Sequence, residues 1–153
     1  ILSAAEMHFT LAEAALKGWT VGDAQAHYEA GVKASLETWG VGGQYATYIG
    51  GNAAYDGTLA QIMNQKWIAS WTAATEAWFD YRRTGLPVLK TGVSSIRQVL
   101  PVRFPYGDNE TGLNVDNVNS AIGQLELTNY SAGEGQNSSW SKQWLLQGTN
   151  KPW

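Results

Sequence analysis

Apolar residues recur every three or four positions through the first forty residues, which predicts two amphipathic helices. The first runs from Leu2 to Lys17, and its apolar face carries Leu2, Ala5, Phe9, Ala12 and Leu16. The second is capped by Asp23 and reaches about Trp39, with an apolar face made of Ala24, Tyr28, Val32, Leu36 and Trp39. Gly18 and Gly40 directly follow the two segments, as expected of residues that end helices.

Small residues on both predicted helices indicate that the two helices pack closely. Ala12, Ala24 and Gly31 alternate with the bulky Tyr28, which fits a tetratricopeptide-type helix hairpin. Glycine inside a helix costs about 1 kcal/mol relative to alanine, so close packing is the expected reason for Gly31. One such unit cannot bury both of its faces, and other helices must therefore stack on it. The solvent-exposed faces are expected to carry charge pairs four residues apart, Glu13 with Lys17 and Glu29 with Lys33.

A Gly- and Tyr-rich connection over residues 40–57 separates this pair from a long helical segment. The connection is too long for a simple link between packed helices, so we expect it to be functional or partly mobile. The helical segment spans about Thr58 to Arg83, with a break expected near residues 70–72, where Thr72 would cap the second part. Its spacing predicts a buried face that includes Trp67, Trp71 and Trp78. The segment ends with cations, a glycine and a proline that suit a helix C-terminus: Arg82, Arg83, Gly85 and Pro87.

The sequence changes character after residue 87. Pro101 and Pro105 bracket a short segment that reads as extended, and residues 106–112 read as a polar turn. Asn114 or Asp116 is expected to cap a short helix that reaches about Leu125, and residues 128–139 read as a loop. The predicted fold is therefore mainly α: a tetratricopeptide-like helix pair and a long helix over residues 1–87, then an irregular, loop-rich part over residues 88–153.

Composition narrows the classes of function. The chain has 153 residues, a formal net charge of −3 and 15% charged residues, which argues against a nucleic-acid or anionic-membrane binder. It has no cysteine, which excludes thiolate chemistry and cysteine-based metal sites. Trp is frequent, with 8 residues, as in a large packed core or a stacking surface for planar or sugar ligands. The chain opens inside a predicted helix without an initiator Met, so we expect a fragment that lacks its N-terminal part and any export signal.

Several phrases in fixed order carry a family resemblance. They are Gln61–Ala69, Glu76–Pro87, Leu100–Tyr106, then Glu110 and Asn114, preceded by Ala5-Glu6, Leu11–Ala14, Gly18-Trp19 and Gly22–Ala24. Together, over most of residues 1–127, the chain resembles the SusD/RagB family of outer-membrane nutrient-binding lipoproteins. It departs from the family at Gly107, where a proline is common, and at Trp144-Leu145, where an aromatic doublet is common.

The resemblance implies a role as well as a fold. The chain would be the C-terminal portion of one SusD-like domain, anchored through a lipid-bearing cysteine that lies outside it. The whole protein would capture oligosaccharide at the cell surface, without a cofactor, and act with a SusC-like TonB-dependent transporter. The family motif includes Arg82, Arg83, Gly85, Pro87, Arg103, Pro105, Glu110 and Asn114. On these grounds the isolated chain is expected to leave apolar surface exposed.

Four aromatic residues are candidates for stacking on sugar rings, although helix packing explains them as well. They are Trp39 at a helix end, Tyr45 and Tyr48 in the Gly-rich connection, and Trp140 between serine-rich flanks. A further hypothesis pairs Arg103 with Glu110, so that the guanidinium anchors a loop.

Enzymatic and metal-binding alternatives find little support. Glu76 and Asp80 share a helix face, but neighbouring arginines would lower the pKa that a glycosidase acid needs raised, so a helix-end ion network is the better interpretation. His8 and His27 lack a third ligand at metal-site spacing, and no nucleophile–base pair is evident. The main alternative to sugar binding is a helical-repeat scaffold that binds a partner protein.

Overall fold

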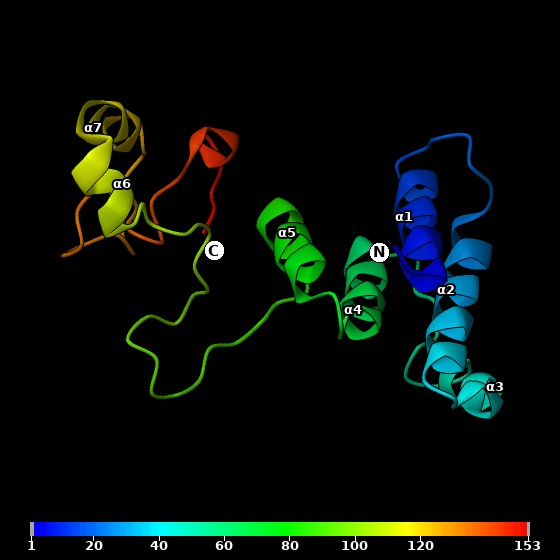
Figure 1. Cartoon of the computed structure of the whole chain (residues 1–153). Coiled ribbons are helices and arrows are strands. Elements are labelled where there is room, and N and C mark those ends of the chain that lie inside the picture. The colour runs from blue at the N-terminus through cyan, green and yellow to red at the C-terminus, as the bar shows by residue number, and fades with distance from the viewer. Residues whose placement is uncertain (1, 153) are drawn as a thin grey trace. The chain divides into compact units, whose positions relative to one another are not determined.

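The computed structural model describes residues 2–152 and divides into two compact units, one ending at Pro87 and the other beginning at Val88. Both units are built from helices and irregular segments (Figure 1). Within residues 2–152 the β pairing is a single isolated bridge, between Glu126 and Lys142. The prediction of a mainly α fold is confirmed.

The first unit begins with a helix hairpin and continues through short helices. Its elements in chain order are α1 (Ala4–Leu16), α2 (Ala24–Thr38), the 3-10 turn η1 (Gly42–Gln44), α3 (Tyr45–Ile49), α4 (Leu59–Ala69) and α5 (Ala74–Thr84). Figure 1 shows α1 lying along α2, and α4 packs against both of these helices.

The ends of the hairpin helices are set by the residues that the sequence indicates. The Asp23 side chain accepts the Ala26 N–H at 2.7 Å and so caps α2. The Ser3 hydroxyl does the same for α1, accepting the Glu6 N–H at 3.1 Å. Gly18 has a φ of +84° just beyond α1, a left-handed conformation that a side chain would disfavour.

The core of this unit lies between α1, α2 and α4. It contains Phe9, Tyr28, Val32, Ile62 and Met63, all nearly fully buried. The Phe9 ring packs edge-on to the Tyr28 ring, with 6.0 Å between their centroids.

Gly31 lies against Phe9, as its predicted role in close helix packing requires. A Cβ at Gly31 would come within 2.9–3.0 Å of the Phe9 ring. The sequence therefore places glycine where the two helices leave no room for a side chain.

The Gly- and Tyr-rich connection is folded onto this core. Its Ala53 is fully buried, and the Ala53 carbonyl accepts a hydrogen bond from the Tyr28 hydroxyl at 2.8 Å. Gln61 on α4 donates to the same hydroxyl at 2.8 Å. The Tyr28 hydroxyl thus joins α2, the connection and α4, and burial raises the pKa of Tyr28 to about 12.

The long helical segment breaks where predicted, but its details differ. The first part, α4, ends at Ala69 and is followed by Ser70, whose hydroxyl donates to the Lys66 carbonyl at 2.8 Å. The second part, α5, starts after Ala73, and no side chain caps it, so the prediction of Thr72 as its cap is wrong.

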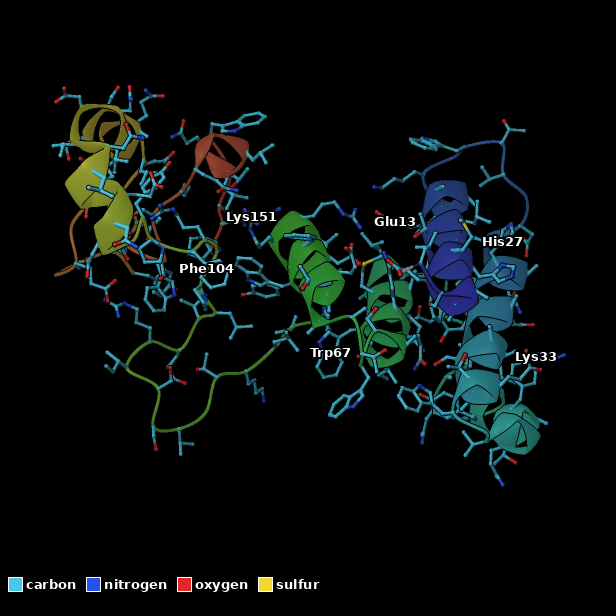
Figure 2. All side chains as sticks on the ribbon, viewed as in Figure 1. Glu13, His27, Lys33, Trp67, Phe104 and Lys151 are labelled. Carbon is cyan, nitrogen blue, oxygen red and sulfur yellow. The ribbon has the colours of Figure 1, made fainter. Side chains whose placement is uncertain are left out.

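The predicted burial of the tryptophans on this segment is also wrong in part. Trp71 is 77% exposed and Trp67 is 40% exposed, whereas Trp78 is half-buried. The buried residues of α4 are Ile62, Met63, Gln65 and Lys66. Trp67 directly follows the last of these, and Trp71 falls in the break between the helices (Figure 2 labels Trp67 on α4).

The second unit combines short helices with loops held by side-chain hydrogen bonds. Its helical elements are α6 (Asp108–Leu113), α7 (Val115–Gly123) and the 3-10 turn η2 (Trp144–Leu146). Residues 106–112 are predicted to form a polar turn, but the chain enters helix directly after Gly107, and most of this segment belongs to α6. Asn114 stands between α6 and α7, where the sequence predicts a helix start, but its side chain caps neither.

Arg103 does not pair with Glu110, so that hypothesis is wrong. Its guanidinium donates to the Ser138 carbonyl at 2.9 Å and to the Asn137 side chain at 3.3 Å, and it lies 5.2 Å from the Tyr106 ring centroid. Glu110 is exposed on α6. Arg103 anchors the loop around residue 138 to the Pro101–Pro105 segment; it bonds to amide oxygens rather than a carboxylate.

Candidate functional site

A cleft on the first unit lies between the end of α1 and helices α4 and α5. Its volume is about 300 Å³, and it is lined by charged side chains and by one tryptophan, Trp19. We call it the Trp19 cleft. This volume is at the small end of the ~300–1,000 Å³ typical of ligand pockets.

A chain of ion pairs forms the cleft wall. Glu13 on α1 receives Arg83 of α5 through both carboxylate oxygens, with Arg83 Nη2 and Glu13 Oε2 2.8 Å apart. Arg83 also bonds Asp80 at 2.8 Å, and Asp80 bonds Lys66 of α4 at 2.7 Å. Lys17 completes the set at 2.7 Å from Glu13. Three helices are thereby fixed relative to one another by side chains that share partners.

Glu13 is the most perturbed carboxyl of this wall. Its side chain is only 8% exposed, so it does not lie on a solvent-exposed face as predicted. Burial alone would raise the pKa of Glu13, but the hydrogen bonds from Arg83 and Lys17 outweigh burial and lower that pKa to about 2. Bonding to Glu13 likewise raises the pKa of Arg83. In Figure 2, Glu13 lies on the side of α1 that is turned toward α4.

The other predicted charge pair also forms differently. Lys33 faces Glu37 at 4.0 Å, and Glu29 instead accepts a hydrogen bond from Gln25 at 2.7 Å. Lys33 points outward from α2 in Figure 2, and such exposed pairs contribute little to stability.

Trp19 stands at the rim of the cleft and is 68% exposed. Its backbone is held in place, because its N–H bonds the Ala14 carbonyl at 3.0 Å while the Gly18 N–H bonds Ala15 at 2.9 Å. These bonds end α1 and leave the indole facing outward. Sequence reasoning did not single out Trp19 as a site residue, although a tryptophan directly after a helix-ending glycine is outside both apolar faces.

A second, smaller hollow contains Trp39. It has a volume of about 70 Å³ and lies between the start of α1, the end of α2 and the α4–α5 break. Trp39 is half exposed. Its other lining residues include a carboxylate and several hydroxyls: Glu6, Ser3, Ser35, Thr38, Ser70 and Thr72. We call it the Trp39 pocket.

The other aromatic candidates are engaged in packing. Tyr45 and Tyr48 are half-buried against the core, and Tyr48 exchanges hydrogen bonds with Gln65 at 3.0–3.2 Å. In the second unit the Trp140 indole N–H donates to the Val99 carbonyl at 3.0 Å, and the Arg97 guanidinium lies 4.3 Å from the Trp140 ring. Part of each ring is therefore already occupied, and sugar stacking on them stays a prediction.

The remaining motif residues have structural positions. Gly85 ends α5 with a φ of +80°, and Pro87 follows it at the end of the first unit. Arg82 lies 4.7 Å from the Trp78 ring centroid. Pro105 is exposed just after the residues that Arg103 anchors.

The histidines pair with each other. His8 and His27 approach to 3.2 Å between their Nδ1 atoms, and His27 Nε2 lies 2.9 Å from the Val21 carbonyl. Across residues 2–152, no cluster of three or more His, Cys, Asp or Glu side chains is arranged to hold a metal ion. In the same range no helix is long and apolar enough to span a bilayer.

A comparison with family models places the chain. Residues 1–107 match the SusD-like family described as starch-binding and associating with the outer membrane. The chain belongs to the SusD-like family. This confirms the resemblance that the sequence motifs indicate.

Solved structures agree with this assignment. A SusD homologue from Bacteroides fragilis superposes with a TM-score of 0.72 at 26% identity, over 94% of this chain and 34% of that one. A chitin-binding SusD homologue from Flavobacterium johnsoniae gives 0.67 at 32% identity, over 81% and 33%. A SusD homologue from Parabacteroides distasonis gives 0.63 at 30% identity, over 76% and 28%.

The SusD-like chain thus spans about a third of the length of these relatives. A comparison with curated proteins gives no match.

Proposed function

We propose that this chain is part of a non-catalytic glycan-binding protein of an outer-membrane nutrient uptake system. The whole protein would be a surface-exposed lipoprotein that works with a SusC-like TonB-dependent transporter. Membership of a family described as starch-binding and associating with the outer membrane supports this proposal. The chitin-binding relative from Flavobacterium johnsoniae supports a carbohydrate ligand more generally.

The observation that carries the proposal within this chain is the exposed indole of Trp19 above a charged cleft. The C–H face of a pyranose ring is apolar and fits an indole, while the hydroxyl groups at its edge need hydrogen-bond partners. The cleft offers both, because Glu13, Asp80, Lys17 and Lys66 stand around Trp19. Hydrogen bonds to charged groups are each worth about 1.5–3 kcal/mol.

The ion pairs suit binding rather than bond cleavage. Glycosidases need a protonated carboxyl close to a second carboxylate. In this cleft Glu13 is held ionised by Arg83 and Lys17, and Asp80 is bonded by both Lys66 and Arg83. A wall fixed by its own ion pairs also needs little rearrangement on binding, which lowers the entropic cost of association.

The test is a titration of the purified protein with starch and chitin oligosaccharides, followed by calorimetry or by retardation in a polysaccharide gel. Replacing Trp19 by Ala should weaken binding by about tenfold or more, as removal of a stacking tryptophan typically does. Trp71→Ala is the matched control, since Trp71 is 77% exposed but is not among the residues that line the cleft. Trp39→Ala and Tyr45→Ala test the positions predicted from sequence.

The two possible failures are distinct. If the wild-type protein binds neither oligosaccharide, the proposed glycan function is contradicted. If sugar binds but Trp19→Ala changes nothing, the function stands and the cleft is not its site.

A second candidate function, a scaffold that binds a partner protein, is favoured by one observation. Trp67, Ile68 and Trp71 are all exposed at the end of α4, and exposed tryptophans are frequent in protein interfaces. Co-purification with the transporter that is lost in Trp71→Ala and kept in Trp19→Ala would support it. The opposite result would contradict it.

A further inference from the structure

The Trp39 pocket has a charge that nothing in its wall neutralises. Glu6 is the sole charged residue among the residues that line it, and the other polar groups there are Ser and Thr hydroxyls and the Trp39 indole N–H. Glu6 as a whole is 8% exposed. The Glu6 carboxylate oxygens are not among the buried polar atoms that lack a partner, so they are open to solvent although the residue is mostly covered. A carboxylate that has only water to bond favours an occupant that donates hydrogen bonds or carries positive charge.

The position of Glu6 on α1 explains only part of this arrangement. Ser3-x-x-Glu6 has the spacing of a capping box, in which each side chain bonds the backbone of the other. One half is present, since the Ser3 hydroxyl accepts the Glu6 N–H at 3.1 Å. Among the described residues no hydrogen bond or ion pair reaches the Glu6 carboxylate, so the reciprocal half is open. The dipole of α1 helps to hold the charge but leaves its lone pairs available.

The size of the pocket limits what can enter it. Its volume of about 70 Å³ is less than half of the ~150 Å³ of an apolar protein cavity that holds one benzene molecule. A pyranose ring does not fit in that space, but a single small substituent does. Trp39, half exposed beside the pocket, is then left to receive the ring outside it.

We propose that the Trp39 pocket is a subsite for an amino sugar, which places its ammonium group against Glu6 and its ring on Trp39. This inference rests on the proposed glycan function and adds a ligand class to it. An ammonium group donates three hydrogen bonds and carries the positive charge that would neutralise the Glu6 carboxylate. The hydroxyls of Ser35 and Thr38 can accept its remaining bonds.

The experiment varies the charge on the ligand and on the protein separately. Oligosaccharides of glucosamine, N-acetylglucosamine and glucose, matched in length, are titrated into the wild-type protein and the Glu6→Gln variant. The wild type should bind the glucosamine oligomer about tenfold more tightly than the N-acetylated one, as expected for one charge-assisted pair. Glu6→Gln should bring that ratio close to one and leave the affinity for the neutral oligomers unchanged.

Glu37→Gln controls for the general attraction of a cation to an acidic protein. Glu37 is an exposed carboxylate on α2 and does not line the pocket. This variant should keep the full preference for glucosamine. Trp39→Ala provides a second test, because removal of a half-exposed side chain leaves the core intact, and it should also weaken glucosamine binding.

The proposal is overturned if the wild type shows no preference for the amino sugar, or if Glu6→Gln keeps that preference. It is also overturned if Trp39→Ala binds the glucosamine oligomer like the wild type. Each of these results leaves the proposed glycan function standing as long as one of the oligomers binds. Failure of all the oligomers to bind would instead contradict the proposed function itself.

Discussion

Replacing Gly31 by Ala should destabilise the first unit, although alanine is the better helix former. Gly31 is inside α2, where alanine would ordinarily stabilise by about 1 kcal/mol. The added methyl group would lie 2.9–3.0 Å from three atoms of the Phe9 ring, whereas ordinary contacts begin near 3.4 Å. The ring would therefore have to move by about half an ångström.

Phe9 has little freedom to make that movement. It is fully buried, and its ring packs edge-on to Tyr28, itself fully buried. Overpacking of this kind typically costs 1–3 kcal/mol. After the gain in helix propensity, we expect the free energy of unfolding to fall by about 1 kcal/mol.

Urea denaturation of the purified protein, followed by circular dichroism, measures this change. Lys33 is at an exposed position of the same helix, so the stability difference between Lys33→Gly and Lys33→Ala measures the helix propensity of alanine over glycine without a steric clash. In a Phe9→Leu background the smaller side chain should relieve the contact, so Gly31→Ala should become neutral or stabilising. If Gly31→Ala stabilises the wild type as much as alanine stabilises position 33, the packing argument is wrong.

Two further predictions concern buried polar groups. Because the pKa of Glu13 is lowered from 4.5 to about 2, its ion pairs stabilise the fold above pH 4.5, and this stabilisation is lost as the pH falls toward 2. The contribution, up to about 3 kcal/mol, should be missing when the free energy of unfolding of Glu13→Gln is measured against pH. Identical pH profiles of the variant and the wild type would contradict this prediction. Tyr28→Phe removes the hydroxyl that bonds the Ala53 carbonyl and should lower the free energy of unfolding by about 1–2 kcal/mol in urea denaturation. Tyr45→Phe, at a less buried ring, should lower it clearly less. Equal effects of the two variants would argue against the role of the Tyr28 bond.

The sequence predicts the hairpin well because local signals and packing agree there. Asp23 caps α2, Gly18 ends α1, and Gly31 meets Phe9, each for the reason its residue type suggests. Such positions depend on backbone geometry and nearest neighbours, which spacing along the chain encodes directly.

The errors arise where a distant segment decides the outcome. Glu13 looks like an exposed partner of Lys17 until Arg83, 70 residues away, covers it. Trp67 and Trp71 have the spacing of one apolar face, but the break after α4 ends the helix on which that spacing depends. Helical periodicity describes the faces of one continuous helix, so it predicts neither a partner from another helix nor the point where one helix ends and a new one begins.

The candidate site follows the same division. Trp39 is identifiable at a helix end, but its hollow also needs Ser3 from α1 and Thr72 from the break. Trp19 had a local signal, its place directly after Gly18, whereas the cleft beneath it brings together helices α1, α4 and α5.

The way α1 ends links its last turn to whatever occupies the cleft. The Trp19 N–H closes that turn by donating to the Ala14 carbonyl. The same residue therefore carries both the exposed indole and the backbone bond that ends the helix. A sugar resting on the indole would hold Trp19 still and thereby suppress fraying of the helix end. Slower amide hydrogen exchange at Gly18 and Trp19 would then report ligand occupancy from the backbone alone.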